Sequence, residues 1–219
     1  MTETAPAAGS RADFDSLIPW ARHLFAHGAG PADVMRAIYG VGLPQEFYVL
    51  AQAEAAGLGD ELPYHPMVHP WQLLVVADPA ATPYTGDRWA RRQEERAFAQ
   101  YPDFLPVLQL AAITEPRYNR YIVGYDLAAL RAGTVLVLGH RGDFPQTGAE
   151  LRPVGDSLLG MIHVIAVDDL EIRRAQLEDP RNFGFGSIGD EQVDEAVEQL
   201  QRVAALLRGD GNCPSTDQR

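Results

Sequence analysis

Residues 121–138 read YIVGYDLAALRAGTVLVL, and this stretch decides the expected fold. It contains two apolar runs, over 121–127 and 134–138, rich in the β-branched and aromatic residues that favour strands. Only the six residues 128–133 join the two runs, and a connection this short suits antiparallel neighbours. The stretch therefore predicts two adjacent antiparallel strands, with a further strand candidate just before them over residues 105–113.

Apolar residues at helical spacing flank these strands on both sides. Helices are predicted before them over residues 15–27, 31–39 and 43–56, and after them over 157–167, with a charged segment 168–178 continuing or following it, and over 190–208. There is no alternating β-α-β series, so a doubly wound nucleotide-binding fold is disfavoured. The pattern predicts an α+β fold with N-terminal helices, a central, mostly antiparallel sheet and C-terminal helices packed on it.

Two segments between the N-terminal helices and the strands lack such periodicity. Prolines at 63, 66 and 70 are expected to prevent regular structure over residues 62–70, and the apolar run 73–77 predicts a short buried strand. Residues 86–100 are polar and rich in arginine. This second segment predicts a surface loop that leads into an exposed helical turn.

The length of 219 residues fits one domain with additions. We expect an α+β domain over residues 13–170 and a helical extension of the same domain over 171–209. The small and polar residues at 1–12 and 210–219 predict disordered tails.

The charge composition excludes several kinds of chemistry. The chain has 30 acidic and 18 basic residues, a formal net charge of −12, and no lysine at all. Schiff-base formation, a pyridoxal-phosphate anchor and a Walker A loop all need a lysine. The acidic balance also argues against nucleic-acid binding, which needs a basic face. A basic protein partner would suit this charge better.

The apolar runs and the cysteine content bear on location. No run approaches the roughly 18 residues that span a bilayer, and residues 1–12 contain no apolar core of a signal peptide. Cys213 is the only cysteine, so neither an intramolecular disulfide nor a cysteine metal cluster can form. We expect a soluble, cytoplasmic protein without a membrane partner.

A glycine-rich string at 184–189 reads GFGSIG and matches the dinucleotide-binding pattern G-x-G-x-x-G. Its context does not fit, because the residues before it do not form a strand pattern and no following strand with a ribose-binding acid is present. A linker whose Ser187 or Asp190 caps the last helix is the preferred interpretation. No cofactor is expected.

The histidines are the remaining candidates for chemistry. His23 and His27 lie four residues apart on a predicted helix and could face one metal ion, but no Glu follows His23 as the zinc-protease pattern requires. His65 and His69 share this spacing in a proline-rich stretch, and His140 ends a strand without a nucleophile motif. We expect no metal site, and a small metal-dependent enzyme that uses these histidines stays open as an alternative.

Three motifs together carry a family resemblance. The first is AIYGVGLPQEFYVL at 37–50, in which a helix, a glycine and a Leu-Pro pair precede an aromatic helix. The second is YIVGYDL at 121–127, a strand that ends in an aspartate, and the third is DSLL at 156–159, at the start of a helix. Over residues 30–166 the chain resembles the SUKH superfamily, the Smi/Knr-like proteins. The segments 86–100 and 190–208 look like additions to that family's pattern.

The resemblance implies an α+β domain without catalytic residues. Such domains serve in bacteria largely as immunity proteins that bind and neutralise toxins, and in yeast as a regulatory scaffold. We therefore expect a non-enzymatic protein-binding domain, foremost an immunity protein whose acidic surface meets a basic toxin such as a nuclease. A regulatory scaffold is a second alternative. Within the arginine-rich segment, the candidates for partner contact are Arg88, Trp89, Arg91 and Arg92.

Overall fold

The computed structural model describes residues 14–55, 64–80, 88–112, 119–145, 147–179 and 188–209. The two expected tails, Cys213 and most of the glycine-rich string at 184–189 lie outside this part of the chain.

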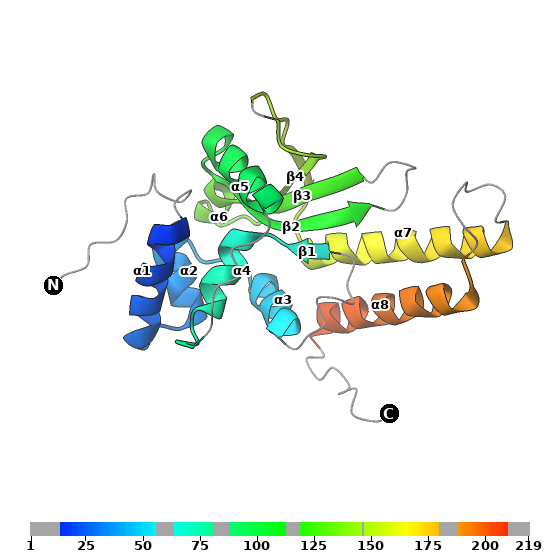
Figure 1. The fold of residues 1–219 in the computed structure, drawn as a ribbon, viewed down its shortest axis with the longest axis horizontal. Helices are drawn as coiled ribbons and strands as arrows, with labels where there is room; N and C mark the ends of the chain where they lie inside the picture. Colours follow the sequence, from blue (N-terminus) through cyan, green and yellow to red (C-terminus); the bar gives the residue numbers. More distant parts are fainter. Residues whose placement is uncertain are drawn as a thin grey trace.

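The described residues form eight helices and one five-stranded sheet, with helices at both ends of the chain (Figure 1). The predicted α+β class is therefore confirmed. The helices are α1 Phe14–Ala26, α2 Pro31–Tyr39, α3 Gln45–Ala55, α4 Val68–Val75, α5 Arg88–Gln100, α6 Leu127–Arg131, α7 Leu158–Glu178 and α8 Asp190–Arg208. The strands are β1 Tyr64–Pro66, β2 Phe104–Ala112, β3 Asn119–Asp126, β4 Val137–Arg141 and β5 Arg152–Gly155. No helix among the described residues is both long and apolar enough to cross a membrane.

The terminal helices follow the sequence prediction closely. Helix α8 begins with two acids, Asp190 and Glu191, and ends at Gly209, whose φ of 73° is left-handed. Helix α7 begins after Ser157, whose hydroxyl accepts a hydrogen bond from the Gly160 N–H at 2.9 Å. This helix runs unbroken to Glu178, so the expected division at residue 170 falls inside it. Figure 1 shows α7 and α8 as a long antiparallel pair.

The sheet is an antiparallel meander in the order β1-β2-β3-β4-β5. Strand β4 begins three residues later than predicted, because the connection from β3 contains helix α6. The carboxylate of Asp126 caps this helix by accepting the N–H groups of Ala128 and Ala129 at 2.8 and 3.1 Å. Thr134 donates its N–H to Ala129 O at 3.0 Å and so closes the turn after the helix instead of starting the strand.

The prediction for residues 62–77 is wrong in two respects. Pro66 lies in the edge strand β1 and Pro70 lies in the first turn of α4, and both positions tolerate the missing N–H. Leu73 belongs to α4, where it is buried with Trp71, so the predicted strand at 73–77 does not form. A short apolar run does not distinguish a buried helix from a buried strand.

The sheet is covered on both faces. Tyr121, Val123 and Tyr125 of β3 face the larger core, which also contains Phe47 of α3. Ile122 faces a smaller core built with residues that include Phe104, Phe144 and Ala97 of α5. In Figure 1, α5 lies above the strands and α3, α4 and α7 lie below them.

A bulge in β2 positions α4 against the sheet. The pairing of β2 with β3 shifts between Pro106 and Leu108, so the adjacent residues Val107 and Leu108 both enter the larger core. The carbonyl of Val107 accepts hydrogen bonds from the Met67 N–H at 2.9 Å and from the indole Nε1 of Trp71 at 2.6 Å. The bulge thus anchors the start of α4.

Candidate partner-binding surface on helix α5

The arginine-rich segment forms a helix of 13 residues, α5, so the expected surface loop with an exposed turn is wrong. The inner side of α5 carries two buried polar residues, Gln93 and Glu94, beside the buried Ala97 and Phe98. Because half of the buried positions are polar, the sequence lacks the apolar periodicity by which amphipathic helices are recognised.

Helix α5 holds the connection between β4 and β5. Side chains of α5 and of the next residue, Tyr101, bind residues 143–145 and 149 of this connection. Trp89 Nε1 donates to Asp143 Oδ2 at 3.0 Å, Gln93 Oε1 accepts the Phe144 N–H, and Arg96 Nη1 donates to Phe144 O at 2.8 Å. Gln100 Nε2 donates to Pro145 O at 2.9 Å, and Gln100 Oε1 accepts the Ala149 N–H at 2.9 Å. The hydroxyl of Tyr101 donates to Ala149 O. These six hydrogen bonds join the helix to the described part of the connection.

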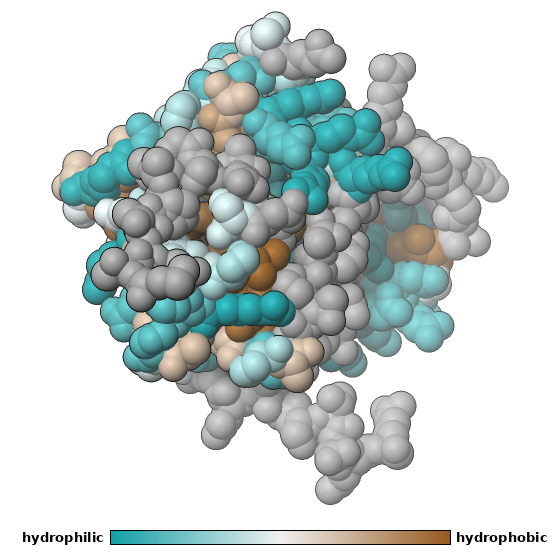
Figure 2. All heavy atoms as spheres, turned by 60° about the vertical axis from the view of Figure 1, so that its left-hand side comes forward, coloured by the Kyte–Doolittle hydropathy of each residue, from teal (hydrophilic) through white to brown (hydrophobic). Residues whose placement is uncertain are grey.

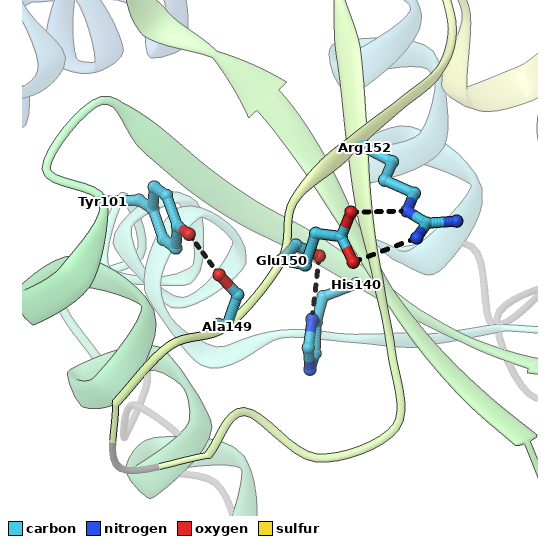
Figure 3. Close-up of polar contacts among 5 residues, drawn as sticks. All are labelled: Tyr101, His140, Ala149, Glu150 and Arg152. Carbon is cyan, nitrogen blue, oxygen red and sulfur yellow. Dashed lines mark hydrogen bonds and ion pairs between the residues drawn. The ribbon is translucent and has the colours of Figure 1, made fainter.

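His140 of β4 binds the same connection (Figure 3). Its Nδ1 lies 3.1 Å from Glu150 O and its Nε2 lies 3.2 Å from Asp143 O, while the ring packs on Phe144 with centroids 4.4 Å apart. Glu150 also forms a two-pronged ion pair with Arg152, whose hydrogen bonds lower the pKa of the Glu150 carboxyl. Both ring nitrogens of His140 thus face backbone carbonyls, which favours a structural role over that of a base.

The outer side of α5 carries three arginines, Arg88, Arg91 and Arg92, which we call the arginine face. Arg88 and Arg92 are exposed and Arg91 keeps 37% of its side chain exposed. Arg92 Nε donates to Arg88 O at 2.9 Å, and Arg91 lies 3.7 Å from Glu95. Of the four sequence candidates, three therefore share an outer face. Trp89 instead contributes its indole N–H to the anchoring of α5.

Hydrophilic residues dominate this part of the surface. Figure 2 turns the left-hand side of Figure 1 forward, and hydrophilic residues there form a broad area at the height of α5.

Glu94 is a buried carboxyl that sequence reasoning missed. Its Oε1 accepts the His69 N–H at 2.8 Å, at the start of α4, while Oε2 is buried and has no hydrogen-bond partner among the described residues. Burial raises the pKa of Glu94 to about 8, against the opposing effects of the His69 and Val68 N–H groups and of Arg91. The carboxyl therefore ties α5 to the N-terminus of α4.

Glu46 is a second carboxyl without a sequence signal. It lies on α3 and accepts four hydrogen bonds from residues 79 to 113 positions away. The donors are Tyr125 OH at 2.8 Å, Ser157 Oγ at 2.7 Å, Leu158 N at 3.0 Å and Leu159 N at 3.3 Å. Glu46 thus joins α3, β3 and the N-terminus of α7. No local pattern could reveal partners so far along the chain.

Replacing Glu46 by Ala is expected to lower the free energy of unfolding by about 2 kcal/mol, because buried donors lose their acceptor. Glu46→Gln keeps one acceptor oxygen and should lose less. The exposed neighbour Gln45→Ala is the matched control and should change stability by less than about 0.5 kcal/mol. Urea unfolding measures all three. Equal stability of Glu46→Ala and Gln45→Ala would contradict this role.

The histidine candidates are distributed over different elements. His23 and His27 stack at the end of α1 with ring centroids 4.1 Å apart, and His27 Nδ1 lies 2.8 Å from His23 O. His27 thus interacts with the helix C-terminus. His65 is exposed on β1, whereas His69 is buried in α4, where burial lowers its pKa to about 4. In the part of the chain that the structure describes, no group of three or more His, Cys, Asp or Glu residues could hold a metal ion.

No family model, no curated protein and no solved structure matches this chain. The motif residues nevertheless have clear physical roles. Pro44 precedes α3, Asp126 caps α6 and Ser157 caps α7. Phe47 and Leu50, in the first motif, are fully buried in the larger core.

Proposed function

We propose that the protein is a non-enzymatic protein-binding domain, and specifically an immunity protein that neutralises a toxin. The main support for this proposal is that the two sides of α5 have different contacts. Its inner side chains hold the β4–β5 connection, whereas the arginine face points outward. The SUKH-like motifs over residues 30–166 support the immunity role. Arginine is also among the residues that most often dominate binding energy in protein interfaces.

The use of three acids at contacts between elements, Glu46, Glu94 and Asp169, supports a binding role. Glu46 and Glu94 bind the N-termini of α7 and α4. Asp169 Oδ2 lies 2.8 Å from Arg173 Nε, and Arg173 Nη1 donates to Gln192 O at 3.0 Å, which links α7 to α8. Burial raises the pKa of Asp169. Each of these carboxyls is thus engaged in holding helices together.

The net charge of −12 supports a basic partner. A charge of this size attracts a basic toxin over long range and raises the rate of association, an effect that salt weakens. We also propose a cytoplasmic location, which agrees with a single cysteine in 219 residues.

Co-expression with the product of the neighbouring gene is the test. We expect a stoichiometric complex, with an association rate that falls roughly tenfold or more between low and physiological salt. The double variant Arg88→Glu/Arg92→Glu should weaken the complex, because it removes the arginine contacts, although it also adds negative charge that favours a basic partner. The control Arg174→Glu/Arg208→Glu changes the net charge equally, at exposed positions on α7 and α8, and should bind like the wild type.

Two results would count against this proposal. One is the absence of toxicity and of complex formation for every neighbouring product. The other is stoichiometric zinc or iron in the purified protein that disappears on replacing His23 and His27, which would favour the metal-dependent enzyme. A stable complex without any toxicity would favour the regulatory scaffold.

A further inference from the structure

The arginine face lies where it costs helix stability. Arg88, Arg91 and Arg92 fall within the first five residues of α5, and the first turn of this helix contains no acid. Cations are unfavourable near a helix N-terminus, because the helix dipole is positive there. The described helices α2 and α8 follow the opposite rule, with Asp33 or with Asp190 and Glu191 in their first turns and Arg36 or Arg208 in their last.

The three arginines also repel one another. Arg88 lies three residues from Arg91 and four from Arg92, so their side chains are neighbours on the helix surface. Among the described residues, Glu95 on α5 lies 3.7 Å from Arg91, and the carboxylate of Asp143 accepts a hydrogen bond from Trp89 on the same half of the helix. Glu94 is buried, and its raised pKa of about 8 leaves it mostly uncharged at neutral pH. The N-terminal half of α5 is thus locally positive on a chain of net charge −12.

Neither packing nor solubility accounts for the placement of Arg88 and Arg92. Both are exposed, whereas Arg91 is partly buried and its charge acts on the buried Glu94. A net charge of −12 already keeps molecules apart. Local rules that are broken without a structural gain are expected at functional sites. We propose that the arginine face binds a carboxylate-rich segment of a partner protein. This inference rests on the protein-binding part of the proposed function and not on the toxin.

Carboxylates fit the arginine face for two reasons. A guanidinium group binds a carboxylate through two parallel N–H···O bonds, and arginines at i, i+3 and i+4, whose Cβ atoms lie about 5 to 6 Å apart, offer several such groups on one side of the helix. Phosphates could form the same bonds, but a nucleic acid spreads its charge over a length that the remaining acidic surface repels. A short acidic segment meets only the local positive charge.

Helix α5 presents these arginines on a rigid support. Arg96 donates to the C=O of Phe144, Gln93 accepts its N–H, and Trp89 donates to Asp143, so the helix does not need to be ordered on binding. A surface held in place before binding loses less conformational entropy when a partner docks.

Binding of labelled hexaglutamate to the full chain at about 50 mM salt tests this inference. We expect Arg88→Glu/Arg92→Glu to weaken binding by about tenfold or more, because charge-assisted pairs become repulsive. The control Arg174→Glu/Arg208→Glu, with the same net charge, should weaken it by less than about threefold. Hexathymidylate should bind more weakly than hexaglutamate.

Three outcomes would overturn the inference: no binding of hexaglutamate by the wild type, equal loss in the two double variants, or tighter binding of hexathymidylate. Arg88→Gln/Arg92→Gln, which removes charge without reversing it, replaces the reversed variant if that variant does not fold, and it should also lose affinity. Hexaglutamate binding without any toxic neighbour would remove only the immunity role. Toxin rescue that does not depend on the arginine face, with no hexaglutamate binding, would remove this inference and the assignment of the arginine face as the partner-binding surface, but not the immunity role.

Discussion

Gly124→Ala is expected to lower the free energy of unfolding by more than about 3 kcal/mol, or to prevent folding. A Cβ at Gly124 would lie 1.9 Å from the Leu105 carbonyl oxygen and 2.8 Å from the Pro106 Cα. Both atoms belong to the backbone of β2 beside its bulge, so neither can move without breaking the pairing of β2 with β3. Chemical unfolding and circular dichroism measure the loss.

Gly139→Ala is the matched control for this prediction. Gly139 lies on the neighbouring strand β4, and a Cβ there would meet the side chain of Val154 at 3.1 Å. Val154 is 38% exposed and can shift, and Ala also loses less conformational entropy than Gly on folding. We expect a change of less than about 1 kcal/mol. Similar losses in the two variants would show that the close approach at Gly124 is not what requires a glycine.

The second large effect is a pH dependence set by Glu94. The pKa of the Glu94 carboxyl is about 8 in the folded protein, whereas the ordinary value for a glutamate, taken here for the unfolded chain, is 4.5. The folded state therefore binds the proton more tightly, and stability falls as pH rises from 4.5 towards 8. His69 acts in the opposite sense, because burial lowers its pKa from 6.5 to about 4 and stability rises with pH across that range.

The two contributions oppose each other below pH 6.5, so the effect of Glu94 stands out above it. Between pH 6.5 and 8 we expect the wild type to lose about 2 kcal/mol of stability. Arg91 and Glu95 also act on Glu94, but their effects are smaller than that of burial. Glu94→Gln removes the titrating group and should flatten the profile in this window.

Urea unfolding at several pH values between 6.5 and 8 tests this prediction. Glu95→Gln is the control, because Glu95 is the exposed neighbour of Glu94 on the same helix. The control should keep the slope of the wild type. A slope that persists in Glu94→Gln would contradict the assignment of the pH dependence to this buried carboxyl.

Much of the fold could be predicted where local signals were strong. Helices α2 and α8 have apolar stripes, glycines at their ends and acids in their first turns. The central strands β2 and β3 are apolar, and the antiparallel pairing of β3 with β4 followed from the short connection between these two strands. These signals depend only on neighbouring residues in the chain.

The rest of the fold depends on contacts that no local pattern shows. All four residues of β5 are exposed, so this strand has no buried side and lacks the alternating pattern by which a half-buried strand is recognised in a sequence. Helix α5 buries Gln93 and Glu94, whose polar side chains look like surface residues in the sequence. The predicted strand at 73–77 failed because Trp71 and Leu73 are buried on a helix that packs against the bulge of β2.

The position of the candidate site in the chain could be predicted from the sequence, but the contacts of its side chains could not. The arginines of α5 stand out because they cluster, and three of the four candidates do share an outer face. The anchoring role of Trp89, Gln93 and Arg96 could not be seen, because their partners lie 48 to 54 residues away.

The most direct test of the central claim is growth of cells that express the toxic product of the neighbouring gene. Wild-type protein is predicted to restore growth, Arg174→Glu/Arg208→Glu to restore it equally, and Arg88→Glu/Arg92→Glu to fail although it is folded and equally abundant. Full rescue by Arg88→Glu/Arg92→Glu would contradict the assignment of the arginine face as the partner-binding surface.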